Sequence, residues 1–104
     1  MSSTEASDTA AITSRPRLVF FHSRVSGRSR RVEAYLAQVL QRRRNHETFA
    51  FYAVAQEERP DLLERFGVVL TPTLVVVEGR SITARLESPR SSREIAGFLA
   101  PWLN

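Results

Sequence analysis

The 104-residue chain contains no cysteine, and its fifteen basic residues include no lysine. Without cysteine the chain has no disulfide framework, no thiol catalysis and no cysteine-ligated zinc. Its two histidines, His22 and His46, lack the HxxxH and HExxH spacings of zinc sites, so we expect no metal. There is no glycine-rich phosphate loop, and no apolar run approaches the length of a membrane-spanning helix. We therefore expect neither a cofactor nor a membrane association.

Arginine is the basic residue throughout, and the formal net charge is +4. An arginine-only set of cations is typical of a GC-rich genome, and it also fits a basic surface for acidic or phosphorylated partners. The hydrophobic content of 42% and the charged content of 25% are ordinary for a globular protein. A chain of this length forms one domain with a modest core.

The first 14 residues are small and polar, which predicts a flexible segment ahead of a folded domain over residues 15–104. This segment carries Glu5 and Asp8, and it lacks the apolar run of a secretory signal. We therefore expect the protein to be cytoplasmic.

The most informative stretch begins with Leu18–Phe21, a continuous apolar run that predicts a strand covered on both faces. After Ser26-Gly27-Arg28-Ser29, apolar residues follow at helical spacing at Val32, Tyr35, Leu36, Val39 and Leu40. This spacing predicts a helix from Ser26 or Ser29 to Arg44, with Asn45 as a left-handed stop. Arg42-Arg43-Arg44 would then interact favourably with the helix dipole, which we favour over a nucleic-acid patch.

The rest of the chain predicts three more strands and two more helices. Alternating apolar residues indicate strands over Thr48–Val54, Leu74–Val77 and Ser81–Leu86. Pro60 begins a short helix to Phe66 with Gly67 after it, and a capping box of Ser91 and Glu94 begins the last helix. The predicted order is β-α-β-α-β-β-α.

The strand, the S-G-R-S turn, PDLLERFGVVLTPT and LVVVEGR together resemble the thioredoxin family, from about Arg17 to Leu103. The resemblance implies an α/β fold with a central mixed sheet flanked by helices. It places the family's C-G-P-C motif on Ser26-Gly27-Arg28-Ser29, the preceding aromatic on Val25 and the cis-proline on Pro72. The family's buried aspartate, which handles the proton in thiol exchange, falls on Phe20.

These replacements decide what we expect the chain to do. Serine hydroxyls cannot replace the thiolate or the resolving thiol, so we expect no thiol-disulfide oxidoreductase activity as sequenced. The resemblance implies that the residue before the cis-proline offers its backbone to an extended peptide, which needs no cysteine. We therefore expect a non-catalytic module that binds a protein or extended peptide through Val25, Ser26, Gly27, Arg28, Ser29, Thr71 and Pro72.

Alternatives remain at this point. Ser26 lies where some thioredoxin-fold enzymes hold the thiolate of glutathione with a serine hydroxyl, so the chain is also a candidate glutathione-binding protein. The helix start and the arginines near it form a candidate anion site, with Arg24, Arg28, Arg30 and Arg31. The two serines also fit an engineered Cys-to-Ser form of an oxidoreductase, although the loss of the aspartate at Phe20 argues for a natural sequence.

Overall fold

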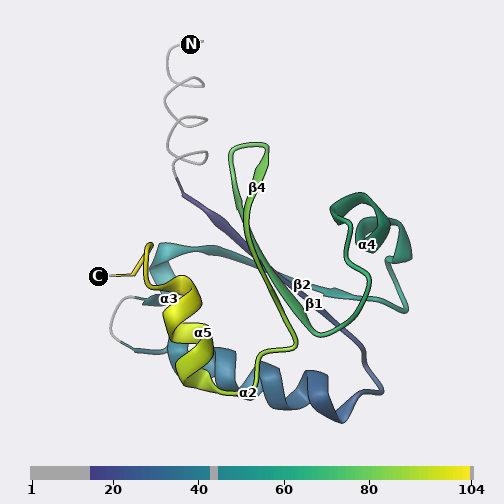
Figure 1. Cartoon of the computed structure of the whole chain (residues 1–104), viewed down its shortest axis with the longest axis horizontal. Coiled ribbons are helices and arrows are strands. Elements are labelled where there is room, and N and C mark those ends of the chain that lie inside the picture. Colours follow the sequence, from purple (N-terminus) through teal and green to yellow (C-terminus); the bar gives the residue numbers. More distant parts are fainter. Residues whose placement is uncertain (1–14, 43–44, 104) are drawn as a thin grey trace.

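The computed structural model of the protein describes residues 15–42 and 45–103. Its sheet has the strand order β2-β1-β3-β4 (Figure 1). The strands are β1 Arg17–His22, β2 Ala50–Ala55, β3 Thr73–Glu78 and β4 Ser81–Glu87. β2 runs parallel to β1, whereas β3 is antiparallel to both β1 and β4. The predicted mixed sheet is confirmed, while the segment of residues 1–14 lies outside the described residues.

The helices of the described residues are α2 Gly27–Leu40, α3 Asn45–Thr48, α4 Pro60–Phe66 and α5 Ser92–Leu99. α2 and α5 lie on one side of the sheet, and α4 lies on the other (Figure 1). None of them is both long and apolar enough to cross a bilayer. The α/β class and the predicted order of elements are confirmed, with α3 as an addition.

β1 contributes to the core on both sides of the sheet, because alternate residues of a strand face opposite sides. Leu18 and Phe20 belong to the cluster under α2 and α5, with Val32, Leu36, Val39, Phe49, Leu74, Val76, Ile95 and Leu99. Val19 and Phe21 belong to a smaller cluster with Val68, Val75 and Val77. The prediction that Leu18–Phe21 is covered on both faces is therefore confirmed.

A short helix covers the second face. α4 packs against this smaller cluster through Leu62, Leu63 and Phe66. Gly67 follows at φ 67°, a left-handed conformation that favours glycine and ends the helix as predicted. Arg85 of β4 donates hydrogen bonds to the carbonyls of Phe66 and Gly67, at 2.9 and 2.8 Å. The C-terminus of α4 is thereby attached to an edge strand of the sheet.

The prediction that the first long helix runs to Arg44 is wrong, because α2 ends at Leu40. Val39 is the last buried residue of its apolar face. Arg42 is exposed, so no apolar burial offsets the entropy cost of a further helical turn. Positions 43–44 lie outside the described residues.

Asn45 was expected to end a helix, but it begins one. α3 covers Asn45–Thr48, and Phe49 directly after it is buried in the core. The strand predicted over Thr48–Val54 therefore begins later, and β2 covers Ala50–Ala55. Four residues carry too little periodicity for such a helix to be predicted from the sequence.

A β-bulge in β4 changes which residues share a face. Ala84 lies opposite Val76, but Ile82 lies opposite Val77, so Thr83 is the extra residue. Because directly opposed residues share a face, Ile82 shares the face of Val77 and not that of Ala84. Simple alternation over the predicted strand Ser81–Leu86 would place Ile82 and Ala84 on one face, and the bulge is the reason that they lie on opposite faces.

Candidate functional site

Strand pairing brings the two predicted segments to one end of the sheet. Phe21 of β1 lies opposite Thr73 of β3, and Thr73 lies opposite Glu87 of β4. The loop that follows β1 therefore leaves the sheet beside the segment that enters β3. Both segments lie at the end of the sheet where α2 begins (Figure 1).

The two serines of the S-G-R-S turn fix the loop to the helix. Ser26 is the N-cap of α2, and its Oγ accepts a hydrogen bond from the Ser29 N–H at 3.1 Å. The Ser29 side chain is almost fully buried, with 2% exposure, and its Oγ accepts the N–H of Ser23 at 3.0 Å. Gly27 and Arg28 lie exposed between them. Ser29 therefore shapes the loop, and almost none of its surface is exposed to a ligand.

A carboxylate outside the predicted site also holds this loop. Glu57 accepts hydrogen bonds from the Ser23 hydroxyl at 2.5 Å and from the Arg24 N–H at 3.2 Å. Ser23 is the first cause of a lowered pKa at Glu57 and the Arg24 N–H is the second, since both stabilise the charged carboxylate. Arg24 also forms an ion pair with Glu58. The side chains of Glu57 and Glu58 therefore both hold the loop before α2 in place.

The second segment, Thr71-Pro72, presents backbone and not a pocket. The peptide bond between these two residues is cis. Pro72 is fully buried, and its carbonyl accepts the N–H of Ser88 at 2.8 Å. The Thr71 hydroxyl donates to Oε1 of Gln56 at 2.5 Å. Within residues 15–42 and 45–103, neither the backbone N–H nor the C=O of Thr71 has a hydrogen-bond partner.

Exposed apolar side chains lie on both segments. Val25 is 84% exposed in the loop before α2, and Val69 is 83% exposed just ahead of Thr71. Leu70 is 40% exposed. We call Val25, Val69, Leu70 and Thr71 the loop surface. Val69 and Leu70 were not among the predicted site residues, although an apolar run that ends two residues before Pro72 was a signal for them.

No protein-family model matches the sequence, and no curated protein matches it. Solved structures do. Trxlp from Edwardsiella tarda EIB202 superimposes with a TM-score of 0.76 at 19% identity, over 91% of each chain. Thioredoxin NaTrxh from Nicotiana alata gives 0.75 at 14% identity, over 100% of this chain and 89% of its own. Reduced desulfothioredoxin from Desulfovibrio vulgaris Hildenborough gives 0.72 at 24% identity, over 84% of this chain and 81% of its own. The chain has the thioredoxin fold.

In this thioredoxin fold the chemical groups for thiol exchange are missing. The S-G-R-S turn occupies the start of α2, and the whole sequence contains no cysteine. Phe20, where the resemblance places the aspartate, is 2% exposed, and its ring stacks on that of His22 with centroids 5.1 Å apart. The site can donate and accept hydrogen bonds and bury apolar surface. It cannot form a thiolate or a mixed disulfide.

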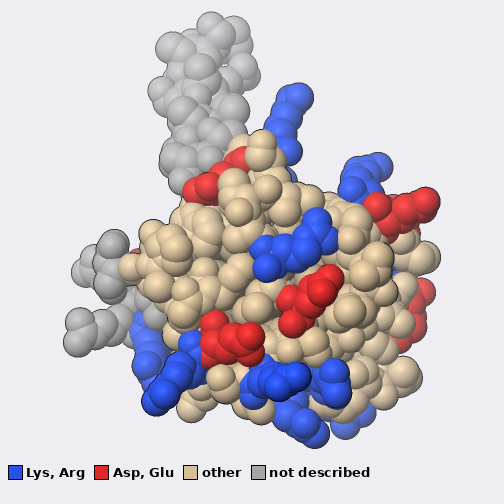
Figure 2. Space-filling view, in the orientation of Figure 1, with Lys and Arg blue, Asp and Glu red and all other residues tan. Residues whose placement is uncertain are grey.

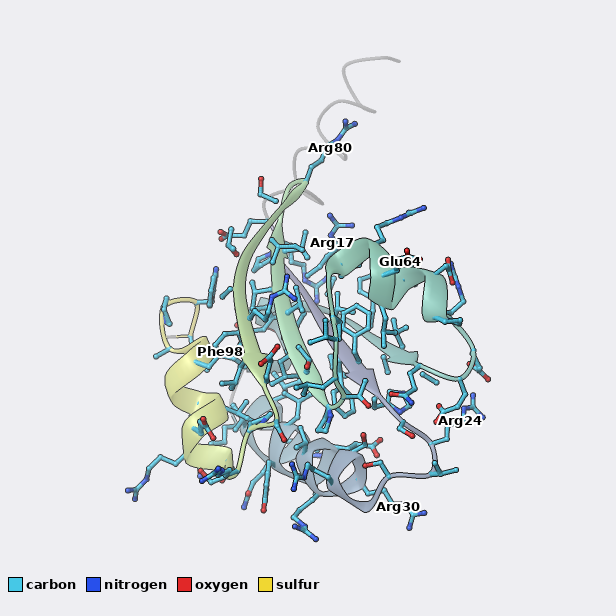
Figure 3. The ribbon with its side chains drawn as sticks, turned by 45° about the vertical axis from the view of Figure 1, so that its right-hand side comes forward. Arg17, Arg24, Arg30, Glu64, Arg80 and Phe98 are labelled. Atoms are coloured by element: carbon cyan, nitrogen blue, oxygen red, sulfur yellow. The ribbon has the colours of Figure 1, made fainter. Side chains whose placement is uncertain are left out.

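The arginines predicted to surround one loop lie in two places. Arg24 and Arg30 line a cavity of about 370 Å³ (Figure 3 labels both). Arg28 and Arg31 line a different cavity, on the side of α2 that faces the end of β4. Among the described residues, no group of three His, Asp or Glu side chains could hold a metal ion. The thioredoxin fold thus does not gather these four arginines at the helix start.

Proposed function

We propose that this thioredoxin-fold protein is a non-catalytic module that binds an extended protein segment or peptide at the loop surface. The observation that carries the proposal is the backbone of Thr71, whose N–H and C=O have no partner within residues 15–42 and 45–103. An extended peptide satisfies such groups by adding a short strand, and this mode of binding needs no side-chain chemistry. It is therefore compatible with the loss of both cysteines.

The flanking residues supply the remaining interactions. Val25, Val69 and Leu70 would bury apolar area against alternate side chains of the bound segment. Arg28 is exposed, and it already donates to Ser88 Oγ at 3.1 Å, so it borders the same end of the sheet. Backbone hydrogen bonds would supply affinity, and the apolar contacts would select the sequence.

The test measures affinity for a peptide selected from a random phage-displayed library, by fluorescence anisotropy of the labelled peptide. Thr71→Pro removes the backbone donor, and Val69→Asp places a charge on a side chain that is already exposed. Thr71→Val is the matched control, because it keeps the backbone N–H and the β-branched shape. Ile82→Asp controls for adding a charge to an exposed apolar residue elsewhere.

We expect Thr71→Pro and Val69→Asp each to weaken binding by tenfold or more, which corresponds to about 1.4 kcal/mol. The two control variants should bind within about threefold of the parent. Equal affinity of parent and Thr71→Pro would reject the backbone contact. Competition by glutathione at millimolar concentration would instead favour the glutathione-binding alternative at Ser26.

A further inference from the structure

A separate concave site includes Ser88, the residue whose N–H donates to the Pro72 carbonyl. It is a cavity of about 680 Å³ between α2 and the segment that joins β4 to α5. Three arginines line it, Arg28, Arg31 and Arg90, together with Tyr35 and Ser88. Figure 2 shows basic side chains gathered along the lower edge of the molecule, over α2. Three arginines from two separate segments of the chain therefore line one cavity.

Among the residues that the structure describes, no ion pair neutralises these arginines. Within the described ranges 15–42 and 45–103, the side chains of Arg31 and Arg90 form neither an ion pair nor a hydrogen bond. Among the same described residues, the Arg28 side chain donates only to the neutral Ser88 hydroxyl. By contrast, the Arg24 side chain forms an ion pair with Glu58. The cavity is thus lined by cations whose charge is not compensated by direct contact.

Two carboxylates line the same cavity and reduce its charge. Glu94 already accepts the backbone N–H of Arg90 at 2.7 Å, as part of the cap of α5. The side chain of Glu87 forms no hydrogen bond or ion pair with the described residues. With three arginines and two glutamates, the lining side chains carry a net charge of +1. Removing the Glu87 charge should therefore make the cavity a better site for an anion.

We propose that this cavity binds a phosphate group, either free or carried by a larger ligand. Planar guanidinium groups form paired hydrogen bonds with phosphate oxygens, and several converging arginines are the usual way to bind a doubly charged oxyanion. The Tyr35 and Ser88 hydroxyls add donors of the right type. The cavity is roomier than one phosphate needs, so an attached group fits as well. This site goes beyond the peptide function proposed above and does not depend on it.

The test is an NMR titration of the ¹⁵N-labelled protein with inorganic phosphate, at constant ionic strength and near neutral pH. The amide signals of Ser88 and Arg90 should shift and saturate. Arg31→Gln and Arg90→Gln should each weaken binding roughly two- to fivefold, as expected for exposed charge pairs. Arg30→Gln is the matched control. It removes the same charge from the adjacent helix position, and Arg30 lines the other cavity.

A second pair of variants reverses the direction of the effect. Glu87→Gln should tighten phosphate binding by roughly twofold or more, whereas Glu33→Gln, outside this cavity, should leave it unchanged. Phosphotyrosine added in place of phosphate should bind more tightly if the natural ligand carries the group, and equally if the free ion is the ligand. Both results support the site. The proposal is overturned if the Ser88 and Arg90 signals do not saturate, or if Arg30→Gln weakens binding as much as Arg31→Gln does.

Discussion

Replacing Ser29 with alanine tests whether the serines of the S-G-R-S turn are structural. In the folded protein the Ser29 Oγ accepts the Ser23 N–H at 3.0 Å, and Ser29 and Ser23 are only 2% and 6% exposed. Ser29→Ala leaves that donor buried without a partner, which costs about 1–3 kcal/mol. The higher helix propensity of alanine offsets a few tenths of a kcal/mol. We expect a net loss of about 1–2 kcal/mol in the free energy of unfolding.

The assay is urea unfolding followed by circular dichroism, with thermal unfolding as a second measurement. The midpoint should fall while the m-value stays constant, and a loss of this size lowers Tm by at least about 4 °C in a domain of this length. Ser81→Ala is the control, because Ser81 is exposed at the hairpin and forms no side-chain hydrogen bond with the described residues. If Ser29→Ala were as stable as Ser81→Ala, the buried hydrogen bond would not stabilise the loop.

Phe20→Asp, which places a carboxylate where the thioredoxin family has one, should destabilise the fold by at least about 3 kcal/mol, because it buries a polar group among apolar side chains. Phe20→Leu should cost less than Phe20→Asp in the same urea assay, and equal losses would contradict the desolvation argument. The parent chain should not accelerate insulin reduction by dithiothreitol, and any acceleration would show that exchange proceeds without a thiolate. Glu57 has a lowered pKa in the folded state, so its contribution to stability is present above the unfolded-state pKa and is lost as pH falls through the folded-state pKa. Ser23→Ala should raise the pKa of Glu57 in an NMR pH titration, and an unchanged midpoint would show that the Ser23 hydrogen bond is not the main cause.

The sequence predicted the fold well where apolar periodicity and caps agree. The buried run Leu18–Phe21 occurs in the structure, and Ser91 caps α5 as predicted by accepting the Glu94 N–H, although Glu94 in turn accepts the N–H of Arg90 and not that of Ser91. Each of these signals is local, and each has a direct physical cause in burial or in the unsatisfied N–H groups of a helix start. The resemblance placed them in one known arrangement of strands.

Features that depend on contacts between distant segments were not predictable. The end of α2 depends on where the core stops, and the bulge at Thr83 depends on strand register. The cavity beside Ser88 joins Arg31 and Arg90, which are far apart in the sequence. The arginines near the S-G-R-S turn were expected to act together because they are close in sequence. On a helix, however, adjacent residues point in different directions, so Arg30 and Arg31 line different cavities.

The two hydrogen bonds from Arg85 attach β4 to the start of the segment that leads to Thr71. That segment starts at Gly67, and Arg85 donates a hydrogen bond to the Gly67 carbonyl. The positions of Val69 and Leu70 therefore depend on the position of β4. Within the part of the chain that the structure describes, β4 is an edge strand, and one of its sides is open to pairing. Any displacement of β4 that moves the Arg85 side chain would therefore also bear on the exposed valine and leucine, because Leu70 lies only three residues after Gly67.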